Sequence, residues 1–218
     1  MKKLIFIPVL FLSIAATLLT SCGKDKPLTS ETNTVETAST GDLYAVDTAN
    51  SKIEWKGFKV FKSENTSHFG TIRFADGEVS VKDGKLESGK FTANMKSLEN
   101  VNLKDEPAMK SKLEEHLKSG DFFEVEKYPT AKFEISRITP EQNGDYNTLL
   151  DGNLTIKGIT KPVQLKANVT VTGNQVSIAT EPADINREDF GVKFQTPAEN
   201  GILKNEVEIQ VLIKANKK

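Results

Sequence analysis

Apolar and polar residues alternate with a period of two along many stretches after residue 42, and this pattern limits the possible folds most strongly. Near residue 150, for example, Leu150, Leu154 and Ile156 share one face, whereas Asp151 and Asn153 take the other. Each run therefore has one dry face and one wet face, which is typical of an antiparallel sheet. The other alternating apolar sets are Phe91, Ala93 and Met95; Ala131, Phe133 and Ile135; Val163, Leu165, Ala167, Val169 and Val171; and Val207, Ile209, Val211 and Ile213.

Turn signals separate these runs. Asp-Gly, Asn-Gly and Gly-Asn pairs stand at 76–77, 83–84, 143–144 and 173–174. We expect about eight strands, several of them about ten residues long. Because a closed sheet has no exposed edges, the sequence predicts an all-β fold in which an antiparallel sheet closes into a barrel.

One stretch departs from the alternation. Acidic residues and a proline at 105–107 form a helix start, and Gly120 forms a helix stop. Between them Met109, Leu113 and Leu117 recur every four residues. The sequence therefore predicts one short amphipathic helix inserted between strands, with its apolar stripe over a barrel opening or against the outer wall.

The segment at 157–161, Lys-Gly-Ile-Thr-Lys, raises the question of a phosphate-binding loop. Such a loop needs a strand before it and a helix after it, whereas strand patterns flank this segment on both sides. Pro162 also removes one backbone N–H from the loop. The segment therefore predicts a hairpin turn around Gly158.

The N-terminus has the features of an exported lipoprotein. A basic start precedes an apolar stretch at 4–19, which is too short for a spanning helix and is typical of a secretory signal. Leu19-Thr20-Ser21-Cys22 resembles the bacterial lipobox, although a free cysteine is the alternative. We expect a signal peptide at 1–21, a flexible tether at 22–41 anchored to the membrane through acylated Cys22, and a folded domain at 42–218.

Composition argues against several kinds of site. The formal net charge of −1 gives no reason to expect a nucleic-acid partner. One cysteine and two histidines exclude a zinc site of the usual Cys/His spacing. We expect neither a metal nor a cofactor, and no nucleophile with its activating base stands out.

Twelve phenylalanines can either fill a barrel or line a cavity in it, and periodicity leaves both alternatives open. His68 shares the dry face with Ile72 and Phe74, as a core histidine or as a polar contact at a cavity mouth. His116, near the predicted helix end, is interpreted as structural. Arg187 stands beside Glu188 and Asp189, where a surface ion pair is favoured over a clamp at the barrel end.

A series of motifs carries a resemblance to a known family. "SKIEWKGFKV", "HFGTIRFADGEV", "KFTANMKSL", "HLKSGDFFEVEKYPTAKFEI", "GNLTIKGITKPVQL" and "INREDFGV" follow one another in the order seen in the YceI-like proteins. The resemblance implies an eight-stranded, lipocalin-like barrel whose apolar tunnel binds a polyisoprenoid, such as an isoprenoid quinone or a prenyl phosphate. The ligand-binding residues that it implies are Trp55, His68, Ile72, Phe74, Phe91, Met95, Phe133, Leu154 and Ile156.

The sequence therefore favours a lipid-anchored carrier or buffer of an isoprenoid lipid at the bacterial envelope, facing the periplasm or on the outer-membrane surface. An enzyme acting on such a lipid, with His68 and a carboxylate as acid and base, is one alternative. A filled barrel that serves as an interaction module at the envelope is another. The identity of the ligand, the membrane leaflet and the formation of a homodimer stay open.

Overall fold

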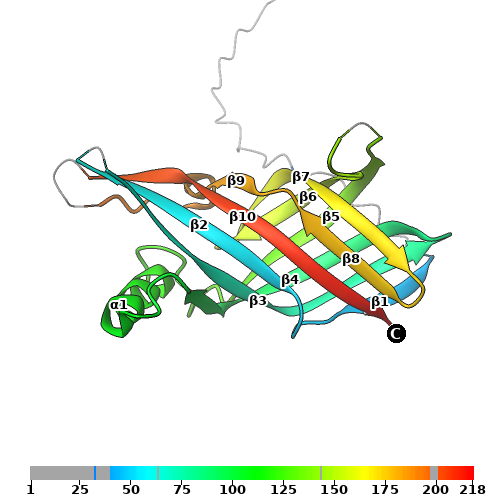
Figure 1. The fold of residues 1–218 in the computed structure, drawn as a ribbon, viewed down its shortest axis with the longest axis horizontal. Helices are drawn as coiled ribbons and strands as arrows, with labels where there is room; N and C mark the ends of the chain where they lie inside the picture. The colour runs from blue at the N-terminus through cyan, green and yellow to red at the C-terminus, as the bar shows by residue number, and fades with distance from the viewer. Residues whose placement is uncertain (1–31, 33–39, 63, 143, 197–200) are drawn as a thin grey trace, which may run out of the picture.

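The computed structural model describes residues 32, 40–62, 64–142, 144–196 and 201–218. Cys22 and most of the expected tether therefore lie outside the described residues. The elements are β1 Asp42–Val46, β2 Lys52–Phe61, β3 Glu64–Lys82, β4 Lys85–Asn100, α1 Pro107–Lys118, β5 Thr130–Pro140, β6 Thr148–Ile156, β7 Ile159–Thr172, β8 Gln175–Thr180, β9 Ala183–Asn186, the 3₁₀ turn η1 Arg187–Phe190 and β10 Gly201–Lys217 (Figure 1).

The described strands form one antiparallel sheet that closes on itself. The order runs β1-β10-β2-β3-β4-β5-β6-β7-β8, and β8 pairs back onto β10 from Leu212↔Ala179 to Asn216↔Gln175. Strand β10 therefore has β2 on one edge and β8 on the other, which joins the last strands to the first. The predicted antiparallel, closed sheet is confirmed.

Two positions in this ring are filled by interrupted strands. Strands β1 and β2 each pair antiparallel with both β10 and β3, but along different stretches of them, so together they occupy one position in the ring. In the same way β8 and β9 follow each other along the opposite edge of β10, with Pro182 between them. The ten described strands thus fill eight positions, which agrees with the predicted number.

The loop at 157–158 is a hairpin turn and not a phosphate loop. Ile156 pairs with Ile159, which leaves a two-residue connection between β6 and β7. Lys157 and Gly158 both have positive φ, 50° and 74°. That combination matches the twist of a tight hairpin, as the sequence predicted.

Helix α1 begins at Pro107 and lies at the end of the ring far from the C-terminus (Figure 1). Proline lacks a backbone N–H and is favoured in the first turn of a helix, because an N–H at that position would have no partner within the helix. Leu113 and Leu117 face the interior of this end, whereas Met109 is 55% exposed, so the predicted apolar stripe is only partly covered. Within the described part of the chain, no helix is long and apolar enough to cross a bilayer.

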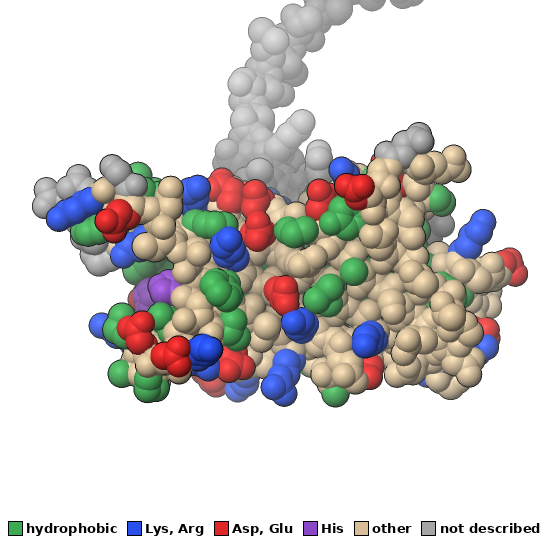
Figure 2. Space-filling model, viewed as in Figure 1, with side chains coloured by type: hydrophobic (Ala, Val, Ile, Leu, Met, Phe, Trp, Pro, Cys, Tyr) green, Lys and Arg blue, Asp and Glu red, His purple; other side chains and the backbone are tan. Residues whose placement is uncertain are grey.

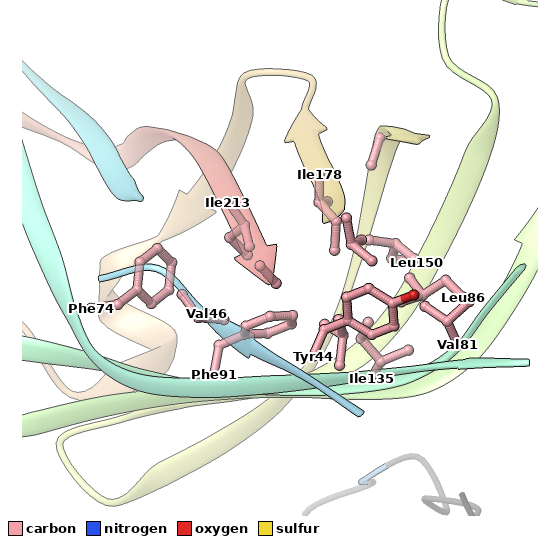
Figure 3. Close-up of a cluster of buried hydrophobic side chains, with 14 of the residues drawn as sticks. Tyr44, Val46, Phe74, Val81, Leu86, Phe91, Ile135, Leu150, Ile178 and Ile213 are labelled. Atoms are coloured by element: carbon pink, nitrogen blue, oxygen red, sulfur yellow. The ribbon is translucent and has the colours of Figure 1, made fainter. Parts of the chain in front are cut away.

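The interior is solid at the end near the C-terminus. Phe74 and Phe91 meet edge to face, with ring centroids 6.3 Å apart, among aliphatic side chains (Figure 3). The Tyr44 hydroxyl donates to the Gly173 carbonyl at 3.1 Å, which satisfies the polar end of this ring. The buried cluster consists of Tyr44, Val46, Phe74, Val79, Val81, Leu86, Phe91, Ile135, Leu150, Leu165, Ala167, Val176, Ile178, Ile213 and Ala215.

Gly70 tests how tightly β3 fits its neighbours. A Cβ at this position would lie 1.8 Å from the Glu99 carbonyl oxygen and 2.8 Å from Cζ2 of Trp55. We predict that Gly70→Ala lowers the free energy of unfolding by about 3 kcal/mol, since the backbone must shift to admit the methyl group. A Cβ at Gly57, on the neighbouring strand, meets nothing within 4 Å.

Gly57→Ala is therefore the matched control and should change the unfolding free energy by less than about 0.5 kcal/mol. Urea denaturation of both variants measures the difference. Equal stability of the two variants would contradict the close approach of β3 to Glu99.

Candidate ligand-binding cavity

An apolar cavity of about 340 Å³ occupies the end of the ring beside α1. Its walls come from β2, β3, β4, β5, β6 and β10, and its cover comes from α1 and the segments around 122–123 and 185–196. The hydrophobic lining residues are Ile53, Trp55, Phe58, Ile72, Ala93, Met95, Leu98, Leu113, Leu117, Phe122, Phe123, Ala131, Leu154, Ile156, Ile185, Phe190, Val192, Phe194, Leu203, Val207 and Ile209. The interior is therefore hollow at this end, although it is packed at the other.

A smaller cavity of about 70 Å³ continues from the first toward the packed core. Both cavities are lined by Ile53, Ala93, Ala131, Leu154 and Ile209, so they lie side by side. Ala93 and Ala131 are direct partners on β4 and β5, and each contributes only a methyl group at the junction. An apolar chain that enters the larger cavity thus has a path toward the smaller one.

The nine residues predicted to bind a ligand all line one of these cavities. The larger cavity is lined by Trp55, His68, Ile72, Met95, Leu154 and Ile156. The smaller one is lined by Phe74, Phe91, Phe133 and again Leu154. Phe74 and Phe91 also belong to the packed core, so they form the inner wall where the hollow part ends.

Aromatic residues outside the strands cover the larger cavity, and the alternating pattern did not predict them. The His116 ring packs edge-on against Phe122, at 5.0 Å between centroids, and against Phe194, at 4.6 Å. Phe122 and Phe194 are themselves 5.1 Å apart. Lys157 fixes this cover by donating from Nζ to the Phe122 carbonyl at 2.7 Å.

Arg187 is a buried clamp, so the favoured prediction of a surface ion pair is wrong. The side chain is 4% exposed and donates to the carbonyls of Val192, at 2.6 Å, and Lys204, at 3.2 Å. It also donates to Oδ1 of Asn205 at 2.9 Å. Burial lowers the pKa of Arg187, but a guanidinium stays charged at neutral pH. The bonds tie η1 and the cover segment to β10, a contact that only the folded chain reveals.

Trp55 contributes a polar atom to the apolar wall. Its indole Nε1 is buried and has no hydrogen-bond partner among the described residues, although the ring lines the cavity. Leaving a buried donor unpaired costs about 1–3 kcal/mol. An oxygen atom of an occupant that reached this N–H would recover part of that cost.

His68 stands at the β2–β3 side of the same cavity. Its Nδ1 lies 3.4 Å from Nδ2 of Asn102, and the roles of the two nitrogens depend on the histidine tautomer. No carboxylate pairs with His68 in the described part of the chain, so the acid–base pair needed for the enzyme alternative is not formed there. The position suits a polar contact at the cavity mouth.

A second depression, of about 920 Å³, lies between the diverging ends of β4 and β5, and its lining mixes charged and polar side chains with apolar ones. Asp151 accepts from Arg137 at 2.8 Å and from Gln164 at 2.7 Å. Burial acts to raise the pKa of Asp151, but these two hydrogen bonds outweigh burial and lower it. With charged groups along its wall, this groove does not suit an apolar chain.

A closed antiparallel ring with a covered apolar cavity at one end has the architecture of the lipocalin-like folds. The profile of the YceI-like domain matches residues 44–215, and the chain belongs to this family.

Relatives and solved structures agree with this assignment. A UPF0312 protein of Pseudomonas putida is 31% identical over 153 residues, which cover 65% of this chain and 76% of that protein. A UPF0312 protein of Pseudomonas paraeruginosa is 31% identical over 159 residues, covering 67% and 78%. Among solved structures, Burkholderia cenocepacia BcnA superimposes with a TM-score of 0.62 at 25% identity, over 78% of this chain and 99% of that one. A polyisoprenoid-binding domain from Saccharophagus degradans gives a TM-score of 0.55 at 12% identity, over 80% of this chain and 98% of that domain's chain.

Replacing the buried clamp tests its contribution to the cover. We predict that Arg187→Lys lowers the free energy of unfolding by about 2–3 kcal/mol, because an ammonium group cannot reproduce three hydrogen bonds in fixed directions. Arg137→Lys is the control, since the Arg137 side chain is 72% exposed and its loss should cost less than about 1 kcal/mol. Urea unfolding distinguishes the two, and equal destabilisation would contradict the clamp.

Proposed function

We propose that this protein binds one apolar lipid chain, an isoprenoid quinone or a prenyl phosphate, inside the ring and shields it from water. The observation that carries the proposal is the cavity of about 340 Å³, whose wall is almost wholly hydrophobic and which continues into the smaller space of about 70 Å³. The fold shared with a polyisoprenoid-binding domain supports the same ligand class. A carrier or buffer role is the simplest use of such a cavity, and the polar neighbour of His68 is an amide, Asn102, and not a carboxylate.

The cavity favours a particular orientation of the ligand. The inner wall at Phe74, Phe91 and Phe133 offers only hydrocarbon, so the end of the chain belongs there. His68, Lys59 and Lys204 line the outer part of the larger cavity. A carbonyl or phosphate head group is therefore placed at this mouth, where polar and cationic side chains replace water.

The expected affinity follows from the burial of the chain. Each buried CH₂ group contributes about 0.8 kcal/mol, so about fifteen groups contribute about 12 kcal/mol, from which ordering costs of about 4 kcal/mol are subtracted. Affinities in the micromolar range then result. Pockets for small ligands span about 300–1,000 Å³, and this cavity lies at the lower end of that range. A long isoprenoid therefore extends past the mouth or displaces part of the aromatic cover.

Filling the junction between the two cavities tests this function. We predict that Ala131→Leu weakens binding of an isoprenoid quinone roughly 30-fold, since three added carbons displace about 2 kcal/mol of buried ligand surface. Quenching of Trp55 fluorescence measures binding directly, because Trp55 is the protein's one tryptophan and lines the cavity. Mass spectrometry of organic extracts from the purified protein identifies the native ligand.

Ala45→Leu is the matched control, because Ala45 lies between inward-facing Tyr44 and Val46 on β1 and points away from the interior. It should bind the quinone like the unmodified protein. Unchanged affinity in Ala131→Leu, or no prenyl lipid in repeated extracts together with no uptake of added quinone, would refute the proposed function.

We also propose that the protein acts at the bacterial envelope, anchored through acylated Cys22. The support is the leader at 1–21 and the lipobox-like Leu19-Thr20-Ser21-Cys22, which lie outside the described residues. We predict that Cys22→Ala abolishes incorporation of labelled fatty acid and releases the protein from washed membranes. Ser21→Ala, which keeps a small residue before the cysteine, should still be acylated. Full membrane attachment of Cys22→Ala would contradict the anchor.

A further inference from the structure

The outer end of the cavity carries a cluster of lysines stacked on phenylalanines, which we call the basic tip. It comprises the hairpin of β2 and β3 and the start of β10. Lys56 and Lys204 lie over the Phe58 ring, with Nζ 5.0 and 5.5 Å from its centroid. Lys59 and Lys62 lie over the Phe61 ring at 5.8 and 5.3 Å. Figure 2 shows basic and hydrophobic side chains side by side at this end of the molecule.

The charges of the basic tip are not neutralised within the described part of the protein. No carboxylate there lies within 4.0 Å of the amino group of Lys56, Lys59, Lys62 or Lys204, even though Glu208 is opposite Lys56 in the strand register. Eight lysines elsewhere in the described chain do pair with carboxylates, as in Lys110 with Glu99 at 2.8 Å. Against these four lysines the same elements carry Glu64 and Glu206, so the tip keeps a local excess of positive charge on a protein whose overall charge is −1.

The basic tip also exposes apolar surface around the cavity mouth. Ile202, opposite Val60 in the sheet, is 61% exposed, more than the other large hydrophobic residues of the described chain. Phe58, Lys59 and Lys204 belong to the tip and also line the cavity. A partner that contacts the tip is therefore positioned directly at the mouth.

We propose that the basic tip docks on an anionic lipid bilayer and holds the cavity mouth against the membrane surface. Lysines near such a surface are attracted to its anionic head groups, while exposed aliphatic and aromatic side chains enter the boundary between head groups and acyl chains. An isoprenoid chain can then pass between bilayer and cavity with little exposure to water. This surface goes beyond ligand binding itself, because a protein could bind the chain without touching a membrane.

The length of the chain before the domain is compatible with this docking. Strand β1 begins at Asp42, which pairs with Val81 near the C-terminal end of β3. The basic tip lies at the N-terminal end of β3, so the domain begins at the opposite end of this strand from the tip. The 19 residues of β3 span roughly 60 Å at about 3.3 Å per residue. The 20 residues from Cys22 to Asp42 reach at most about 70 Å. An anchored Cys22 and the basic tip can therefore contact the same bilayer.

Vesicle flotation tests the proposal on the mature chain, residues 22–218, made without the leader and with Cys22→Ala so that acyl chains do not drive attachment. Every described strand of the ring lies within this chain. We expect binding to phosphatidylcholine vesicles that contain phosphatidylglycerol, loss of binding in high salt, and no binding to phosphatidylcholine alone. Lys56→Gln with Lys62→Gln should weaken binding to the anionic vesicles roughly 30-fold.

Lys82→Gln with Lys85→Gln removes the same charge from the β3–β4 hairpin at the opposite end and serves as the control. It should bind vesicles like the parent protein. Equal weakening by both double variants, or no preference of the parent for anionic vesicles, would overturn the docking proposal. Quenching of Trp55 by a soluble short-chain quinone should be unchanged in Lys56→Gln/Lys62→Gln, because neither lysine lines the cavity. This readout separates a failure of docking from a failure of ligand binding.

Discussion

The size of the inward-facing side chains decides what this ring of strands contains. Every strand has one dry face, so all inward residues must either meet at the centre or enclose space. Near the C-terminus Phe74, Phe91 and Tyr44 meet, and the interior is solid. Beside α1 the paired Ala93 and Ala131 reach only a short way inward, and the interior stays open. The cavity is thus a property of a few small residues within a continuous sheet.

The open end is held in shape by contacts from outside the sheet. Arg187 fastens η1 and the following segment to β10, and Lys157 fastens the Phe122 loop to the β6–β7 hairpin. The rings of His116, Phe122 and Phe194 pack against one another and form the aromatic cover over the strands.

Alternation in the sequence was sufficient to predict the sheet and its inward-facing residues. A period of two reports which face a residue takes, whereas the nine ligand-binding residues came from the resemblance to the YceI-like proteins, and all nine line the two cavities. The period does not report what stands across the ring, so it could not distinguish the packed half from the hollow half. Phe122 and Phe194 lie in irregular segments with no period. Arg187 was misread because its neighbours in sequence, Glu188 and Asp189, are not its partners in space.

The proposed function requires that the ring encloses vacant apolar space that takes a lipid chain. A crystal structure of the mature protein grown with an isoprenoid quinone tests it most directly. We expect continuous elongated density that starts beside His68, passes Trp55 and crosses between Ala93 and Ala131 toward Phe133. Side chains of the aromatic cover turned inward to fill the same space, with no ligand density, would contradict it.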